Sequence, residues 1–322
     1  MRNVTLKTPK ECDSIFTDGT SILAAGKKLW LFRVDGSFVA TFKMIRDPHK
    51  VAFLPQNTAL IDGGGDGSYH YISLNDGSVL WSSLKKGRRN RTSWRFAVSP
   101  DGSVVYDICY DDHGVMHVDR ICPKEKQHNR YRIEDPDMLR VTHDIYCDEE
   151  GNLCAFQSHI VIDPDDLYPQ TSPSMRQNGI LAISFEADEP KCTWKKRWKN
   201  EAKSTRTACG CDGKCILRED FSVLDLDTMK EYRLFQEDVL KTLPRDGFDW
   251  SYEEERQLLT VHYIAAKTNI VIDCKKREVV GKYSRSNGFL GFEGCLVGNE
   301  FWIGTDEGII KYPFPNTEEV LP

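Results

Sequence analysis

The chain has 322 residues, of which 40% are hydrophobic and 29% are charged, a composition typical of a globular protein with a sizeable core. No stretch approaches the ~18 consecutive apolar residues of a membrane-spanning helix, and Met1–Lys7 lacks the apolar block of a secretory signal. The net charge of −6 disfavours nucleic acid as a general partner, and we expect no membrane partner.

Eleven cysteines are scattered from Cys12 to Cys295. An odd number of cysteines is typical of free thiols in a reducing compartment, because a secreted chain would risk mispaired disulfides. We therefore expect a cytoplasmic protein whose cysteines are mostly small, buried core residues.

The predicted elements are short strands from one end of the chain to the other. Apolar runs rich in Val, Ile, Phe, Tyr and Trp alternate with clusters of Gly, Asp, Asn and Pro, and helix signals are few. Asp35-Gly36 and Asp76-Gly77 are hairpin-turn signals, because glycine adopts positive φ without strain. The pattern predicts an all-β protein.

The strands recur with a period typical of propeller blades. The equivalent positions Val34 and Leu74 lie 40 residues apart, and four short strands per ~40–50 residues form one blade. We predict a single seven-bladed β-propeller domain over residues 1–322, built of four-stranded antiparallel blades, with six or eight blades as alternatives. The last blade lacks a strand, which residues 3–7 are expected to supply, closing the ring. The predicted blades are 11–45, 46–87, 92–134, 140–200, 203–238, 245–286 and 288–315.

Two repeats resemble known families. Ala97-Val98-Ser99-Pro100-Asp101-Gly102-Ser103-Val104-Val105-Tyr106 resembles the inner-strand turn of WD40 and YVTN propellers. The segment Tyr71-Ile72-Ser73-Leu74-Asn75-Asp76-Gly77-Ser78-Val79-Leu80-Trp81 resembles a PQQ-like repeat of the quinoprotein dehydrogenase type. The resemblance implies the propeller architecture, which hosts many functions.

Strand alternation predicts which connections share a face. In a four-stranded blade, the connection between strands two and three lies on the same face as the connection to the next blade. This places the longest and most charged connections together, as expected of functional loops on a rigid scaffold. These connections are 62–67, 85–91, 111–114, 163–176 and 195–206.

The segment 85–91 is the strongest binding candidate, with five cations in seven residues: Lys85, Lys86, Arg88, Arg89 and Arg91. It could bind an anionic ligand or an acidic protein, or be a solvated loop. Trp198, with Trp194 among lysines, could form an aromatic and basic surface, or pack on the neighbouring blade.

A second set of candidates lies at predicted starts of inner strands, where polar groups could line the mouth of a central channel. They could bind a ligand or merely face channel water. These residues are Arg95, His143, Asp144, Arg206 and Asp249.

Metal and nucleophile signals are weak. The spacing Cys209-x-Cys211-x3-Cys215 is too short for a zinc knuckle and indicates buried free thiols. The segment Asp111-Asp112-His113, with His117, could supply a metal ligand or a general base, or be a turn with His117 on the third strand. We expect no bound metal or cofactor.

Two functions of different classes follow. The favoured one is a non-catalytic module that binds a protein partner or an anionic group on the loop-rich face. The alternative is an enzyme at the channel mouth, a hydrolase, lyase or isomerase resembling propeller lactonases, with His143, Asp144, Arg206 and Asp249 around a metal or a polarised carbonyl. The sequence leaves the oligomeric state open.

Overall fold

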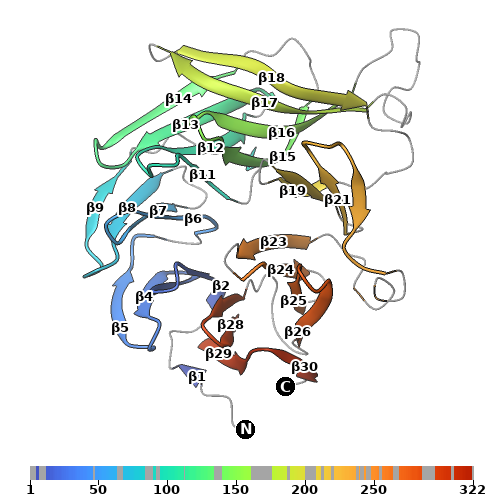
Figure 1. Cartoon of the computed structure of the whole chain (residues 1–322). Coiled ribbons are helices and arrows are strands. Elements are labelled where there is room, and N and C mark those ends of the chain that lie inside the picture. Colours follow the sequence, from blue (N-terminus) through green and yellow to red (C-terminus); the bar gives the residue numbers. More distant parts are fainter. Residues whose placement is uncertain are drawn as a thin grey trace. The chain divides into compact units, whose positions relative to one another are not determined.

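The computed structural model describes the chain as strands joined by turns (Figure 1). The elements of the described residues are all strands, and no helix among these residues is long and apolar enough to cross a membrane. The described residues are 5–6, 12–45, 48–63, 68–83, 90–91, 95–111, 113–133, 140–160, 176–186, 189–199, 208–211, 214–218, 221–236, 239, 243, 248–253, 256–263, 268–284, 294–305 and 308–320.

The strands form seven sheets, each built on antiparallel strands, which we call blades 1 to 7, and the chain divides into two compact units. The first unit comprises Met1–Leu84 and Arg233–Pro322 and contains blades 1, 2, 6 and 7. Blade 1 is β2 (Cys12–Thr17), β3 (Ser21–Gly26), β4 (Leu29–Arg33) and β5 (Phe38–Phe42), and blade 2 is β6 (Val51–Leu54), β7 (Thr58–Asp62), β8 (Tyr69–Ser73) and β9 (Val79–Ser82). Blade 6 is β23 (Phe248–Glu253), β24 (Leu258–Tyr263), β25 (Thr268–Asp273) and β26 (Glu278–Ser284), and blade 7 is β27 (Cys295–Val297), β28 (Glu300–Thr305), β29 (Gly308–Pro313) and β1 (Thr5–Leu6).

The second unit, Lys85–Tyr232, contains blades 3, 4 and 5. In blade 3, the two short strands β10 (Asn90–Arg91) and β11 (Ala97–Val98) both pair with β12 (Val105–Tyr110), which is followed by β13 (Met116–Cys122) and β14 (Gln127–Arg132). Blade 4 is β15 (Arg140–Cys147), β16 (Leu153–Ile160), β17 (Arg176–Glu186) and β18 (Glu189–Lys199). Blade 5 is β19 (Ala208–Cys211), β20 (Cys215–Arg218), β21 (Ser222–Asp225) and β22 (Glu231–Arg233).

The two ends of the chain add strands to blades formed by distant residues. Thr5 pairs with Ile310 and Leu6 with Ile309, so β1 is the outer strand of blade 7. The prediction that the N-terminal segment supplies the missing strand is therefore confirmed. A feature that the sequence analysis did not predict is β30 (Asn316–Val320), which pairs in parallel with β26 as a fifth strand of blade 6. The predicted single domain and the numerical blade boundaries stay predictions.

Neighbouring blades within each unit pack face to face through apolar side chains. In the first unit, one cluster joins blades 6 and 7 through Tyr283 and Phe301, whose rings stack at a centroid distance of 4.2 Å. Other clusters join blades 7 and 1 and blades 1 and 2. In the second unit, clusters join blade 4 to blade 3 and to blade 5. Apolar side chains on both faces of the inner strands are used in this packing. Many of the polar side chains therefore lie at the strand ends.

Three Asp-Gly-Ser turns close the ends of these sheets in the same way. In each, the carboxylate accepts the backbone N–H of the serine two residues later, and the glycine has a φ between 69° and 87°. Hydrogen bonds from the Ser99 hydroxyl and the Ser103 backbone lower the pKa of Asp101 to about 2. The hairpin turns predicted at Asp35-Gly36 and Asp76-Gly77 are confirmed.

Packing between blades predicts where substitutions are costly. Phe301 is completely buried, so Phe301→Ala should lower the free energy of unfolding by about 3–5 kcal/mol, because it removes apolar contacts and leaves a cavity. Phe38 is 58% exposed, and Phe38→Ala should cost less than about 1 kcal/mol. Urea unfolding followed by tryptophan fluorescence measures both. Equal costs for the two variants would contradict the packing described here.

Candidate functional site

A hydrogen-bonded set of side chains joins one end of blade 3 to the same end of blade 4. Tyr110, at the end of β12, has its hydroxyl 2.9 Å from the Thr142 hydroxyl near the start of β15. The Gln157 side-chain amide donates to the same Thr142 oxygen at 3.1 Å. At this end of blade 3, the end of β12 pairs with the starts of β10 and β13, and the start of β13 pairs with the end of β14. At this end of blade 4, the end of β16 pairs with the starts of β15 and β17, and the start of β17 pairs with the end of β18. We call these strand ends, together with Arg95, the 3–4 end.

An ion pair between Arg95 and Asp144 lies beside this network. The Arg95 Nε is 3.2 Å from Asp144 Oδ1, and the Asp144 side chain is 4% exposed whereas that of Arg95 is 35% exposed. The β15 register shifts between Thr142 and Asp144, which pair with the successive residues Gln157 and Phe156. Such a bulge sends Thr142 and Asp144 to opposite faces of the sheet. Because of this bulge, β15 contributes Thr142 to the hydrogen-bonded set on one face and Asp144 to the ion pair with Arg95 on the other.

Gln157 is completely buried, and its Oε1 atom has no hydrogen-bond partner in the structure. An unpaired buried acceptor costs about 1–3 kcal/mol, so such groups are uncommon in folded proteins. A donor group reaching this carbonyl would be stabilised there. The 3–4 end therefore combines a half-exposed cation with a buried acceptor.

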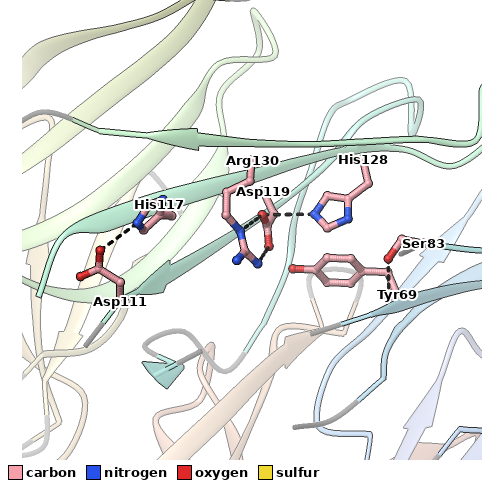
Figure 2. A network of polar contacts seen from close by, with 7 residues as sticks. All are labelled: Tyr69, Ser83, Asp111, His117, Asp119, His128 and Arg130. Carbon is pink, nitrogen blue, oxygen red and sulfur yellow. Dashed lines mark hydrogen bonds and ion pairs between the residues drawn. The ribbon is translucent and has the colours of Figure 1, made fainter. Parts of the chain in front are cut away.

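A second polar arrangement lies on one face of blade 3 (Figure 2). Asp119 on β13 is directly opposite Arg130 on β14, and their side chains form a two-point contact: Arg130 Nε to Asp119 Oδ1 at 2.8 Å and Nη2 to Oδ2 at 3.1 Å. His128 Nε2 is 3.1 Å from the same Oδ1. Asp119 is completely buried, so its charge is compensated by a charge-assisted pair rather than by water. The other contact in the view, from the Tyr69 backbone N–H to the Ser83 hydroxyl, belongs to blade 2.

At the end of the same face, Asp111 orients His117. The Asp111 carboxylate accepts the backbone N–H groups of Val115 and His113, both at 2.9 Å, and its second oxygen is 3.2 Å from His117 Nε2 (Figure 2). These hydrogen bonds, with that from Val115 the strongest, hold the pKa of Asp111 below its usual range. Asp111 is therefore ionised at neutral pH. The turn interpretation of this segment fits, with His117 on the third strand of blade 3.

The predicted site residues separate into three groups. Lys85, Lys86, Arg88, Arg89 and Arg206 lie outside the described residues. Arg91, His143 and Asp249 are described by their backbone position, the first two at the 3–4 end and Asp249 opposite His262 in blade 6 of the first unit. Arg95 and Asp144 are brought together.

Trp198 lies between blades rather than on an open surface. Its ring is parallel to that of Phe156 at 6.1 Å and packs against Cys154, Ile180, Ile216 and Leu224 of blades 4 and 5. Residues 195–199 belong to the outer strand β18, so placing them in a connection was wrong. Trp194 packs instead against the cluster between blades 3 and 4, because a register shift between the pairs Leu181–Trp194 and Ile180–Lys196 turns the two tryptophans to opposite faces of blade 4.

The described cysteines are free thiols, and the described His, Cys, Asp and Glu side chains form no metal site. Nine described cysteines are free, and of these Cys12, Cys109, Cys122 and Cys154 are buried while Cys192 is exposed. In the part of the chain that the structure describes, no group of three or more His, Cys, Asp or Glu side chains could hold a metal ion. Cys209, Cys211 and Arg206 cannot be assessed in this way, because their side chains are outside the described set.

Sequence reasoning missed the polar groups within the sheets. Thr142 and Gln157 gave no signal, because single polar residues in strands are common. Asp119 did leave a signal: His117 and Asp119 are two residues apart and so share one face of the strand, whereas Met116 and Val118 lie on the other face. A buried charge at such a position predicts a cross-strand partner, which is Arg130.

No protein-family model matches the chain, and no curated protein matches it. Among solved structures, the β-propeller domain of Cps50 (Swd1) from Myceliophteria thermophila is similar with a TM-score of 0.60 at 9% identity, over 97% of this chain and 98% of that chain. Virginiamycin B lyase from Staphylococcus aureus is similar with a TM-score of 0.59 at 9% identity, over 96% and 97%. The WD40 β-propeller domain of Doa1 is similar with a TM-score of 0.57 at 10% identity, over 96% and 94%.

At these identities the likeness shows the fold alone, and that fold is shared by WD40 propellers and by a lyase. The predicted all-β, seven-bladed propeller of four-stranded antiparallel blades is confirmed.

The Asp119–Arg130 pair predicts a large effect of removing one partner. Arg130→Met should lower the free energy of unfolding by about 3–5 kcal/mol, because it leaves the Asp119 carboxylate buried without its two-point donor. Arg132→Met, two residues along the same strand at an exposed position, is the matched control and should change stability by less than about 0.5 kcal/mol. Urea unfolding of the full chain measures both, and an Arg130→Met cost no larger than that of the control would contradict the assignment.

Proposed function

We propose that this chain is a β-propeller interaction module that binds an acidic segment of a protein partner at the 3–4 end. The observation that carries the proposal is the Tyr110–Thr142 hydrogen bond, which brings the basic strand ends of two blades together. Basic residues at this end are Arg91, Arg95, Arg132, Arg140, Arg176 and Lys199.

The neighbouring sequence strengthens the positive charge. Residues 84–95, which lead into β10 and β11, contain six Lys or Arg residues and no Asp or Glu in a chain whose net charge is −6. Two carboxylates of the described strand ends already have partners: Asp144 pairs with Arg95 and Asp111 contacts His117. An acidic segment can therefore engage the arginines without first displacing water from unpaired carboxylates.

The sequence between these strands also argues for a short, local ligand. Asp112, Glu134, Asp135 and Asp137 lie in the connections of blades 3 and 4. Carboxylates so close in sequence to the basic strand ends disfavour a long polyanion, whereas a short acidic peptide need only contact the basic residues of 85–95. Arginine suits carboxylate recognition, because its planar guanidinium can donate two parallel hydrogen bonds. This favours an acidic protein segment over nucleic acid.

Charge reversal tests the proposal. A variant with Lys85, Lys86, Arg88 and Arg89 replaced by Glu should bind a fluorescein-labelled oligoglutamate peptide at least about 100-fold more weakly, because like charges then face the ligand at a cost of several kcal/mol. Fluorescence anisotropy with the full chain measures the affinity, and binding by the unaltered chain should weaken as salt is raised, because salt screens the attraction.

The matched control reverses four lysines at the opposite ends of their own sheets: Lys124, Lys214, Lys230 and Lys275. It should bind the peptide within about threefold of the unaltered chain, since the net charge change is the same but the position differs. Equal losses in the two variants would show a general charge effect and contradict the site. Tighter binding of a labelled single-stranded oligonucleotide than of the peptide would overturn the choice of an acidic protein segment.

A further inference from the structure

Three side chains of blade 2 form a continuous hydrogen-bonded series that the proposed function does not use. His70 on β8 is directly opposite Ser82 on β9, and the His70 Nδ1 lies 2.8 Å from the Ser82 Oγ. The other ring nitrogen, His70 Nε2, lies 3.3 Å from the Ser68 Oγ. The imidazole thus connects two hydroxyl groups.

The two serines differ in their access to solvent. Ser82 is exposed on β9, the outermost strand of blade 2, whereas Ser68 and His70 are only 3% and 6% exposed. A reagent in solution can therefore reach the Ser82 hydroxyl, while the ring behind it is sheltered. This is the relation expected between a nucleophile and its base.

The two contacts allow a tautomer of His70 in which the ring can act as a base. If Nε2 carries the proton and donates it to the Ser68 oxygen, Nδ1 has a free lone pair and accepts the proton of the Ser82 hydroxyl. In this state the ring accepts a hydrogen bond from the Ser82 hydroxyl and can take up its proton as Ser82 attacks, while Ser68 holds the ring in position. Ser68 then has the orienting role that a third group plays in a nucleophile–base–orienter arrangement.

Gly63 fixes the inner part of the series. Its backbone N–H donates to the Ser68 carbonyl oxygen at 2.9 Å. A Cβ at this position would lie 2.3 Å from the Ser68 Oγ and 2.9 Å from the His70 Nε2. The backbone of residue 63 is thus pressed against both side chains, and the absence of a side chain there is what lets Ser68 reach the ring. The arrangement is preorganised by packing and not only by hydrogen bonds.

We propose that Ser82 is a nucleophilic serine, activated by His70 as general base, that accepts acyl groups from small activated esters. The Ser82 oxygen forms a bond to the carbonyl carbon of the ester, and its proton passes to His70 Nδ1. The bond from that carbon to the leaving oxygen breaks, the leaving group departs as an alkoxide or phenoxide, and it takes up the proton from the imidazolium. The product is O-acyl-Ser82, and no other reactant is required.

A fluorophosphonate reagent tests this directly, because a serine activated in this way displaces fluoride from phosphorus. The full chain should be labelled at Ser82, as located by mass spectrometry of its peptides. Ser82→Ala should abolish labelling. Ser78→Ala, at an exposed serine of the same hairpin whose hydroxyl donates to Asp76 instead of a histidine, should leave labelling unchanged.

The role of the base is tested with His70→Asn, whose amide can still contact the Ser82 hydroxyl but cannot take up its proton. Labelling should slow by at least about 100-fold, the lower range for loss of a general base. Circular dichroism checks that the variant is folded, and the Ser82 and Ser78 variants decide the outcome if it is not. Labelling that is unchanged in Ser82→Ala, or absent from Ser82 in the unaltered chain, would overturn the proposal. This result is independent of peptide binding at the 3–4 end, which lies in the other unit.

Discussion

Face-to-face packing of apolar side chains between neighbouring blades is the interaction on which the rest of the structure depends. A four-stranded sheet has two faces, and the clusters around Phe301, Trp30 and Phe156 join a face of one blade to a face of the next. Dispersion and the removal of apolar area from water stabilise these contacts. Each blade is too small to bury its own faces, so it depends on its neighbours, as in other repeat architectures.

This constraint determines where polar chemistry can lie. Inside the sheets, a charge is tolerated only with a partner, as Asp119 is with Arg130, because desolvation of an unpaired carboxylate costs several kcal/mol. At the strand ends, side chains meet both the apolar core and solvent. Asp144, in the middle of β15, is buried, while its partner Arg95 reaches the surface. The polar groups that could serve function are thus concentrated at the rims of the sheets and along outer strands.

The proposed binding site for an acidic segment lies at strand ends, and the proposed nucleophilic serine lies on an outer strand. The 3–4 end relies on charge, presented by strand ends that the apolar cluster between blades 3 and 4 and the Tyr110–Thr142 hydrogen bond hold side by side. The Ser82 site relies on an outer strand, where an exposed hydroxyl can have a buried histidine behind it. Both follow from one feature of the fold, which is that rigid sheets place side chains from adjacent strands in fixed register. Neither requires a cofactor.

The sequence by itself determined the architecture, because strand alternation, Asp-Gly turns and a period of about 40 residues are local properties that a single chain displays. It also indicated the basic segment before β10 and the strand that the N-terminus supplies to blade 7. Only the tertiary structure decided that Trp198 packs between blades, that Arg95 meets Asp144, and that His70 lies between Ser68 and Ser82. Those contacts depend on register and on a bulge in β15, and a one-residue shift would send each side chain to the other face.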